Sequence, residues 1–240
     1  MTNHARFAKN MREGMNLVRP PLGLAFLDEP PAGVPRIAKS APSACAFWKA
    51  AETTLFYATA EDHYNCPIGA ITQGFDLPQA VMQQGMELIG RMDSIQYFAA
   101  SEVEHVPKVT KPHRVVVYGP LERFESFSPD LALMICSPYQ AMLLSEVTGA
   151  VAWQGPERDA HIFGRPACAV IPRALSEGSL AASFGCKGAR TFAGIGDNDL
   201  LVAIPGSRLQ DAEVRLSAIL TANAEMQRYY DGRTAQFGPQ

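Results

Sequence analysis

The sequence predicts an α/β protein, or a mixed α+β protein, built as two pseudo-repeat lobes around a shared mixed β-sheet. Three observations support this fold class. Short apolar runs bounded by proline or glycine alternate with segments of helical periodicity. A pattern with two cysteines occurs once in each half of the 240-residue chain, and each half also supplies a strand and a closing helix. We therefore expect one compact unit, with an N-terminal lobe over residues 1–108 and a C-terminal lobe over residues 109–240.

The first half is predicted to begin with a helix and to contain two strands. Phe7, Met11 and Met15 have roughly helical spacing. The apolar run over residues 22–27 lies between proline pairs, which interrupt regular structure. The expected elements are a helix over residues 1–18, a strand over 22–27, a short helix over 44–52, a strand over 54–59, a polar connector over 61–65 and a helix over 77–92.

The second half is predicted to supply three strands and the longest helix. The continuous apolarity of residues 131–136 is typical of a strand that is buried on both faces. Ser137 followed by Pro138 is typical of the start of a helix. The expected elements are strands over residues 113–119, 131–136 and 199–204, helices over 137–149 and 207–230, a polar loop over 157–165 and a frayed stretch over the last ten residues.

Composition and charge argue against several classes of function. The formal net charge is −3 and the pI is near 6.0, and no stripe of Lys and Arg is present, so nucleic acid is not an expected partner. The charged N-terminus lacks the apolar core of a signal peptide, and no apolar run reaches the roughly 18 residues that a membrane span needs. We therefore expect a cytoplasmic protein. Its five cysteines are then more typical of free thiols, metal ligands or catalytic groups than of disulfides.

The pattern with two cysteines is the main functional signal. Cys45 precedes Cys66 by 21 residues, and Cys168 precedes Cys186 by 18 residues. The second cysteine of each pair is followed closely by Gly-Ala, in Cys66-Pro67-Ile68-Gly69-Ala70 and Cys186-Lys187-Gly188-Ala189-Arg190. Pro67 suits the first turn of a helix and predicts that Cys66 lies at its N-terminus. We interpret the pattern as a degenerate internal repeat.

A pseudo-two-fold fold would bring these four cysteines together as ligands of a metal. Four thiolates hold either a zinc ion or an iron–sulfur cluster. The apolar and aromatic flanks, such as Trp48 and Phe56, favour a cluster, with 4Fe–4S as a candidate form. Zinc is the alternative, although no short C-x-x-C motif is present, and a third alternative is no metal, with buried structural cysteines. With a cluster, we expect an enzyme that performs redox or Lewis-acid chemistry on a small molecule, an oxidoreductase or a lyase.

Two further functions remain open. Cys66 and Cys186 alone could act as base and acid on opposite faces of a substrate, as in metal-free racemases and epimerases, because a helix N-terminus favours the thiolate. The protein could also be a non-catalytic carrier of a metal, a haem or another ligand. The chain has no dinucleotide fingerprint, P-loop, nucleophile elbow or zinc-protease motif, which argues against those chemistries. A homo-oligomer is also left open.

Other side chains are candidates for supporting roles. His63, three residues before Cys66, is a base or ligand near the thiol, a cap of the following helix, or an exposed loop histidine. Arg190 either neutralises an anionic substrate or cluster or forms a surface salt bridge. Cys136 lies at the end of an apolar strand and is interpreted as structural. Trp48 and Trp153 are interpreted as core residues rather than pocket residues.

The order of these motifs resembles the domain-of-unknown-function 169 family, also labelled ArCR. The resemblance covers about residues 10–225. It rests on the following segments: Leu22-Gly23-Leu24, Cys45, Asp62 to Ala70, Pro129-Asp130-Leu131, Ser137 to Met142, Cys168, Gly185 to Arg190 and Ala203-Ile204-Pro205. It implies that the four cysteines above match cysteines of the family. It also implies that this chain departs from the pattern at Ala189, where a further cysteine is frequent, and at Ile68, where glycine is frequent. The resemblance implies no activity.

Overall fold

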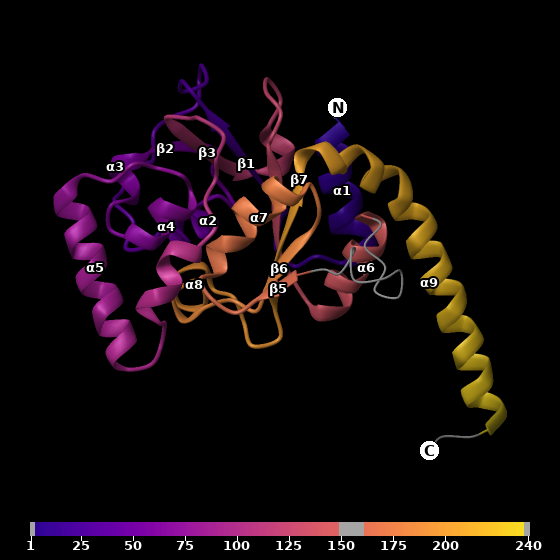
Figure 1. Cartoon of the computed structure of the whole chain (residues 1–240). Helices are drawn as coiled ribbons and strands as arrows, with labels where there is room; N and C mark the ends of the chain where they lie inside the picture. Colours follow the sequence, from indigo (N-terminus) through magenta and orange to yellow (C-terminus); the bar gives the residue numbers. More distant parts are fainter. Residues whose placement is uncertain (1–2, 149–160, 238–240) are drawn as a thin grey trace.

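The fold is a single mixed sheet with helices on both faces (Figure 1). The structure is a computed structural model that describes residues 3–148 and 161–237. In these residues seven strands follow the order β2-β3-β1-β4-β7-β6-β5. Neighbouring strands are antiparallel except β5 and β6, which are parallel. The expectation of a mixed sheet is therefore confirmed, and the fold class is mixed α+β.

The strands are short and mostly apolar, as a sheet that is covered on both faces requires. Their bounds are β1 Leu22–Leu27, β2 Phe56–Thr59, β3 Val115–Pro120, β4 Leu131–Cys136, β5 His161–Phe163, β6 Ala181–Ser183 and β7 Leu200–Pro205. The α-helices among the described residues are α1 Asn3–Met15, α2 Ala46–Ala50, α3 Ala60–His63, α4 Pro67–Thr72, α5 Gln79–Ser94, α6 Pro138–Thr148, α7 Val170–Glu177, α8 Lys187–Ala193 and α9 Leu209–Phe237. Short 3-10 turns include η5 Ala167–Ala169.

The two faces of the sheet pack against different helices. Successive side chains of a strand point to opposite faces, and β4 shows this division. Leu131 and Leu133 join a cluster with residues of α2, α7 and α8, whereas Ala132 and Met134 join a cluster with residues of α1, α6 and α9. In Figure 1, α1, α6 and α9 lie together to one side, away from α2, α4, α5 and α8. All six residues of β4 are buried, as predicted for a strand covered on both faces.

Most of the expected elements are present, and three expectations are wrong. Residues 61–63 of the expected polar connector belong to α3, which begins at Ala60 because Thr59 and Asp62 make a capping box. Residues 161–163 of the expected polar loop form β5, whereas residues 157–160 lie outside the described part of the chain. The expected fraying of the last ten residues is wrong as far as residue 237, where α9 ends.

The strand order relates the two halves of the chain. From the centre of the sheet outwards, the first half supplies β1, β3 and β2, and the second half supplies β4, β7 and β6. The expected boundary after residue 108 assigns β3 to the second lobe, although β3 pairs with β1 and β2. The division into pseudo-repeat lobes stays a prediction. No helix in the described ranges is long and apolar enough to cross a membrane.

Candidate functional site

Four cysteines from four separate segments line one pocket of about 230 Å³. Cys45 is the N-cap of α2, Cys66 the N-cap of α4 and Cys186 the N-cap of α8, while Cys168 lies in η5. These are the four cysteines that the sequence repeat singled out. We call residues 42–48 and 65–69 the first wall of this four-cysteine pocket, and residues 165–168 and 186–192 the second wall.

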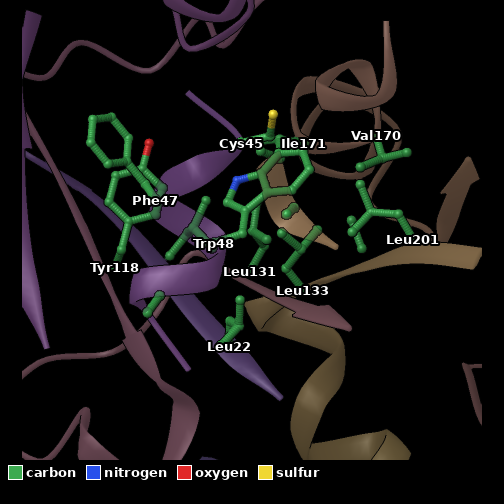
Figure 2. Packing of buried hydrophobic residues seen from close by; sticks show 14 of the residues in the cluster. Leu22, Cys45, Phe47, Trp48, Tyr118, Leu131, Leu133, Val170, Ile171 and Leu201 are labelled. Carbon is green, nitrogen blue, oxygen red and sulfur yellow. The ribbon is translucent and has the colours of Figure 1, made fainter. Parts of the chain in front are cut away.

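The remaining surface of the four-cysteine pocket is mainly apolar. Large side chains come from α2, α5, the segment after α5, and α8, and they are Trp48, Leu88, Met92, Tyr97, Phe98 and Phe192. Trp48, interpreted from the sequence as a core residue, is fully buried and also lines the pocket. Figure 2 shows its indole ring between Cys45 and the leucines of β4. Trp153 lies outside the described residues.

Local sequence explains why Cys66 opens a helix in the first wall. Pro67 occupies the first helical position, where its missing N–H leaves no hydrogen bond unmade. The Ala70 amide donates to the Cys66 carbonyl at 2.8 Å, which starts the helix. A Cβ on Gly69 would lie 2.5 Å from the Cβ of Ala44 and 2.9 Å from the sulfur of Cys66. Glycine at position 69 therefore lets α4 approach the loop that carries Cys45.

In the second wall, a cysteine also begins a helix, but the backbone near it is less closely packed. The Arg190 amide donates to the Cys186 carbonyl at 3.0 Å, so Cys186 begins α8. A Cβ on Gly188 would meet only the Cys186 sulfur, at 4.0 Å. Gly185, just before the cysteine, has a φ of +80°, a conformation that favours glycine. Ala189, where the resemblance implies a frequent further cysteine, also lines the pocket.

One hydroxyl group contacts both sulfurs of the first wall. The Ser43 Oγ lies 3.1 Å from the Cys45 sulfur and donates to the Cys66 sulfur at 3.4 Å. The loop that carries Ser43 is fixed by Asn65, whose amide donates to Ser40 Oγ at 2.7 Å and to the Ala41 carbonyl at 3.0 Å. In the second wall, Thr72 of α4 lowers the pKa of Cys168, while its hydroxyl donates to the Gly69 carbonyl at 2.8 Å.

Burial keeps two of the four thiols in their neutral form. Desolvation raises the pKa of Cys45 to about 11, against the opposing effect of the Ser43 hydrogen bond, and negative charge at Cys66 and Cys186 raises it further. Desolvation also raises the pKa of Cys168, and negative charge at Cys66 adds to this increase. Cys168 is partly accessible because it lines the pocket, but the surrounding protein still desolvates its thiolate.

The candidate metal ligands of the pocket are the soft sulfur atoms of its four cysteines. No Asp, Glu or His is among the described residues that line it. Across residues 3–148 and 161–237, no group of three or more His, Cys, Asp or Glu side chains is placed to hold a metal ion. A single zinc ion with Zn–S bonds of about 2.3 Å needs tetrahedral sulfurs only about 3.8 Å apart. The cysteines in this arrangement do not form such a set.

His63 lies away from the pocket surface and is buried, so its expected position on an exposed loop is wrong. It is the last residue of α3 and has no solvent exposure. Its Nδ1 lies 2.7 Å from the Thr59 carbonyl and its Nε2 2.9 Å from the Tyr118 hydroxyl. Desolvation lowers its pKa to about 4, so the ring is neutral and Nδ1 donates while Nε2 accepts. His63 packs beneath α2, with its ring 4.8 Å from that of Phe47.

Arg190 also does not line the pocket. Its guanidinium group donates to the carbonyls of Phe184 and Gly196 at 2.7 Å each and to that of Gly185 at 3.2 Å. It also pairs with Asp197 at 3.1 Å. These contacts tie the loops on both sides of α8 together, which fits the expected salt-bridge role and positions Cys186.

Cys136 lies on the opposite face of the sheet from the four-cysteine pocket. It is buried among residues of α1, α6 and α9, and burial raises its pKa to about 12. Its interpretation as a structural cysteine agrees with this position.

Sequence reasoning missed Tyr97 and Arg165, which contact each other at the rim of the pocket. Arg165 stands three residues before Cys168, in the position that Pro42 occupies before Cys45. The repeat therefore contained a signal for Arg165. Tyr97 follows α5 and is brought to the rim only by tertiary packing, so no local signal pointed to it.

The fold and the site define a mixed α+β protein with a four-cysteine pocket on one face of its sheet. The chain belongs to the DUF169 family, described as an uncharacterised ArCR, whose model matches residues 10–214. The family resemblance predicted from the sequence is therefore confirmed. The chain is similar to the uncharacterized protein MJ0308 of Methanocaldococcus jannaschii, with 28% identity over 165 residues, which cover 67% of this chain and 69% of that protein. No solved structure matches the chain.

Proposed function

We propose that the four-cysteine pocket binds an iron–sulfur cluster or another thiophilic metal, and that the protein is an enzyme that uses it in redox or Lewis-acid chemistry on a small molecule. The observation that supports this proposal is that Cys45, Cys66, Cys168 and Cys186 line one pocket that contains no carboxylate. A donor set made only of sulfur selects soft metals and iron–sulfur clusters over magnesium, calcium or manganese.

The apolar surroundings of the four cysteines favour a cluster over a single zinc ion. A tetrahedral zinc site draws its four sulfurs close together. In a cluster the cysteines bind different iron atoms, so their sulfurs lie farther apart. The apolar wall would keep the cluster dry, which is one of the factors that set its reduction potential.

The neutral thiols of Cys45 and Cys168 are also compatible with a metal-bound state. Burial makes their thiolates unfavourable in the absence of a cation. A metal ligates the thiolate, so binding would release protons and would weaken as the pH falls. If three cysteines ligate, the fourth iron position would be open to a substrate, which would enter past the rim of the pocket.

The decisive experiment is anaerobic purification of the full chain, followed by its absorption spectrum and its iron and sulfide content. We expect a brown protein with sulfide in near-equal amount to iron. Replacing Cys66 or Cys186 by serine should remove both, while Cys136→Ser, on the other face of the sheet, should retain them. A colourless, metal-free and stable wild-type protein would overturn the proposal.

A metal-free thiol enzyme is the second candidate function, and one observation favours it. Cys66 and Cys186 both cap helices, and they lie in opposite walls of one pocket. As a base and an acid they would exchange a proton on a substrate carbon, as racemases and epimerases do. A metal-free crystal structure with the two sulfurs facing each other across the cavity would support this function, and sulfurs far apart would exclude it. A non-catalytic carrier would bind its metal or haem without an open coordination position.

A further inference from the structure

The rim of the four-cysteine pocket carries a single cation whose surroundings indicate the class of ligand. Arg165 lies between β5 and η5, three residues before Cys168, and it is exposed. Among the described residues that line the pocket, it is the only one with a formal charge at neutral pH. The charge therefore stands at the entrance of an otherwise apolar, sulfur-lined cavity.

Arg165 is held in place without a carboxylate. Its guanidinium carbon lies 4.0 Å from the centre of the Tyr97 ring, and its Nη1 donates to the Tyr97 carbonyl. Tyr97 is itself fixed, because its hydroxyl accepts the Lys187 amide N–H at 3.0 Å. No Asp or Glu in residues 3–148 and 161–237 forms an ion pair with Arg165. Most of its donor fork is therefore left for a ligand, and its orientation is fixed in advance.

We propose that the four-cysteine pocket takes a small monocarboxylate with an apolar body. The carboxylate would bind Arg165 at the rim, and the apolar end would point towards the four cysteines past Met92, Phe98 and Phe192. A monoanion matches the one cation at the rim, whereas a phosphate would bring nearly two negative charges next to groups that become negative when they ligate a metal. The idea that this ligand is a substrate rests on the proposed function, but its binding does not.

The test compares hexanoate with hexanamide, which has the same carbon chain without the charge. Binding of each to the full-length protein is measured by titration followed by nuclear magnetic resonance. We expect hexanoate to bind about tenfold more tightly than hexanamide. Arg165→Gln should remove this preference and Arg165→Lys should retain part of it. Arg91→Gln, an exposed α5 arginine that does not line the pocket, is the matched control and should keep the preference.

Equal affinities of wild-type protein for the two probes would overturn this proposal, as would a preference that survives Arg165→Gln. The wild-type comparison stands even if the Arg165 variants fold poorly. The same titration on protein with and without iron separates this proposal from the proposed function. A colourless, metal-free protein that still prefers hexanoate would overturn the proposed cluster and support the carboxylate site. A brown protein that binds both probes equally would support the cluster and overturn the carboxylate site.

A second inference comes from α9, whose distal part projects away from the rest of the molecule (Figure 1). Its first turns pack against α1 and α6, where Leu209, Ala212 and Leu216 are buried. Further along, Met226 is 47% exposed and Tyr230 57% exposed. A helix without tertiary contacts is only marginally stable in water at this length. We therefore expect the projecting part of α9 to be stabilised by contacts with a partner molecule.

The heptad positions that begin with Leu209 continue into this projecting part, where Met226, Tyr230 and Phe237 are apolar and Asn223 and Arg233 are polar. Intervals of three and four residues alternate through Leu209, Ala212, Leu216, Ile219, Asn223, Met226, Tyr230, Arg233 and Phe237. A strict seven-residue repeat predicts pairing with another helix in a left-handed supercoil. Asn223 falls at a core position of the repeat, where asparagine specifies two-stranded pairing.

The geometry points to a second copy of this chain as the partner, paired through the distal halves of the two α9 helices. Residues 221–237 contain two acidic and two basic side chains, Glu225, Asp231, Arg228 and Arg233. Such a segment is neutral overall and complements itself, and it lacks the basic face that an anionic membrane or nucleic acid would require. The heptad stripe is also continuous with the packed interface between α9 and the helices α1 and α6.

Sedimentation equilibrium of the full chain at tens of micromolar tests this inference. We expect a dimer for the wild-type protein and a monomer for Tyr230→Glu, because a large aromatic side chain between Met226 and Phe237 would be replaced by a carboxylate in the paired core. Ala224→Glu introduces the same charge at an exposed position outside the stripe and should remain a dimer. A monomeric wild-type protein, or a dimer that survives Tyr230→Glu, would overturn it.

Discussion

The two walls of the four-cysteine pocket carry equivalent cysteines but are supported differently. In the first wall one hydroxyl, from Ser43, contacts both sulfurs. In the second wall, the only polar neighbour that lowers the pKa of Cys168 is Thr72 of α4, a helix that belongs to the first half of the chain. The glycines that follow the helix-capping cysteines differ as well. A Cβ has no space at Gly69 but has space at Gly188.

The second wall therefore depends on residues of the first half of the chain. Thr72 of α4 lowers the pKa of Cys168, and the hydroxyl of Tyr97, which follows α5, accepts the amide N–H next to Cys186. Contacts therefore run from the first half of the chain to both cysteines of the second half. We expect damage to the first wall to affect the whole pocket, whereas equivalent changes in the second wall should be tolerated better.

The largest effect should come from loss of a ligand, and here the two walls should behave alike. If all four thiolates bind iron, Cys45→Ser and Cys168→Ser should each lower the iron content more than tenfold, despite their different supports. The measurement is iron and sulfide per chain after anaerobic purification. The same content in either variant as in Cys136→Ser would show that the replaced cysteine is not a ligand.

The next prediction concerns the stability that His63 contributes beneath α2 of the first wall, where it accepts a hydrogen bond from the Tyr118 hydroxyl. The folded pKa of His63 is about 4, below its unfolded value of about 6.5. Its neutral form therefore contributes stability that is fully present above pH 6.5 and is lost as the pH falls towards 4, up to about 3 kcal/mol. Denaturant titrations from pH 7 to 4 should show this loss in the wild-type protein. His63→Gln should weaken the dependence and leave the part that comes from His113, whose pKa burial also lowers, while the exposed control His105→Gln should leave it unchanged.

A third prediction compares the two glycines directly. Gly69→Ala places a methyl group against Ala44 and the Cys66 sulfur, and the resulting strain should cost about 1–3 kcal/mol. Gly188→Ala meets only one atom at ordinary contact distance and should be neutral or stabilising by up to about 1 kcal/mol, because alanine favours helix more than glycine does. Free energies of unfolding in urea measure both changes. Equal costs would remove the distinction between a close-packed first wall and an open second wall.

Several features of the fold could be predicted because local sequence determines them. The continuous apolar runs at residues 22–27 and 131–136 became β1 and β4 with those bounds. Pro67 placed Cys66 at the start of a helix, as predicted. The missed helix α3 also had a local signal, since Thr59 and Asp62 are spaced as a capping box.

Other features depend on contacts between distant segments and had no local signal. The place of β3 between β1 and β2 follows from strand pairing across about 90 residues of chain, which the sequence pattern does not encode. The common pocket of the four cysteines could be predicted, because the repeated cysteine pattern in the sequence already grouped these four residues. The burial of His63 under α2 and the contact of Tyr97 with Arg165 arise from tertiary packing alone.

The smallest expected effect concerns the polar neighbours that lower the pKa of Cys45 and Cys168. It tests whether a residue of α4 influences a thiol of the second wall. The Ser43 hydrogen bond lowers the pKa of Cys45 against the larger effect of burial, and Thr72 does the same for Cys168. Ser43→Ala should therefore raise the pKa of Cys45 and slow its alkylation a few-fold in metal-free protein at pH 9, without changing Cys168. Thr72→Val should slow Cys168 and leave Cys45 unchanged. Mass spectrometry of iodoacetamide-treated protein measures each site separately. If Thr72→Val left the alkylation rate of Cys168 unchanged, Cys168 would not depend on α4. The proposed dependence of the second wall on the first half of the chain would then be wrong.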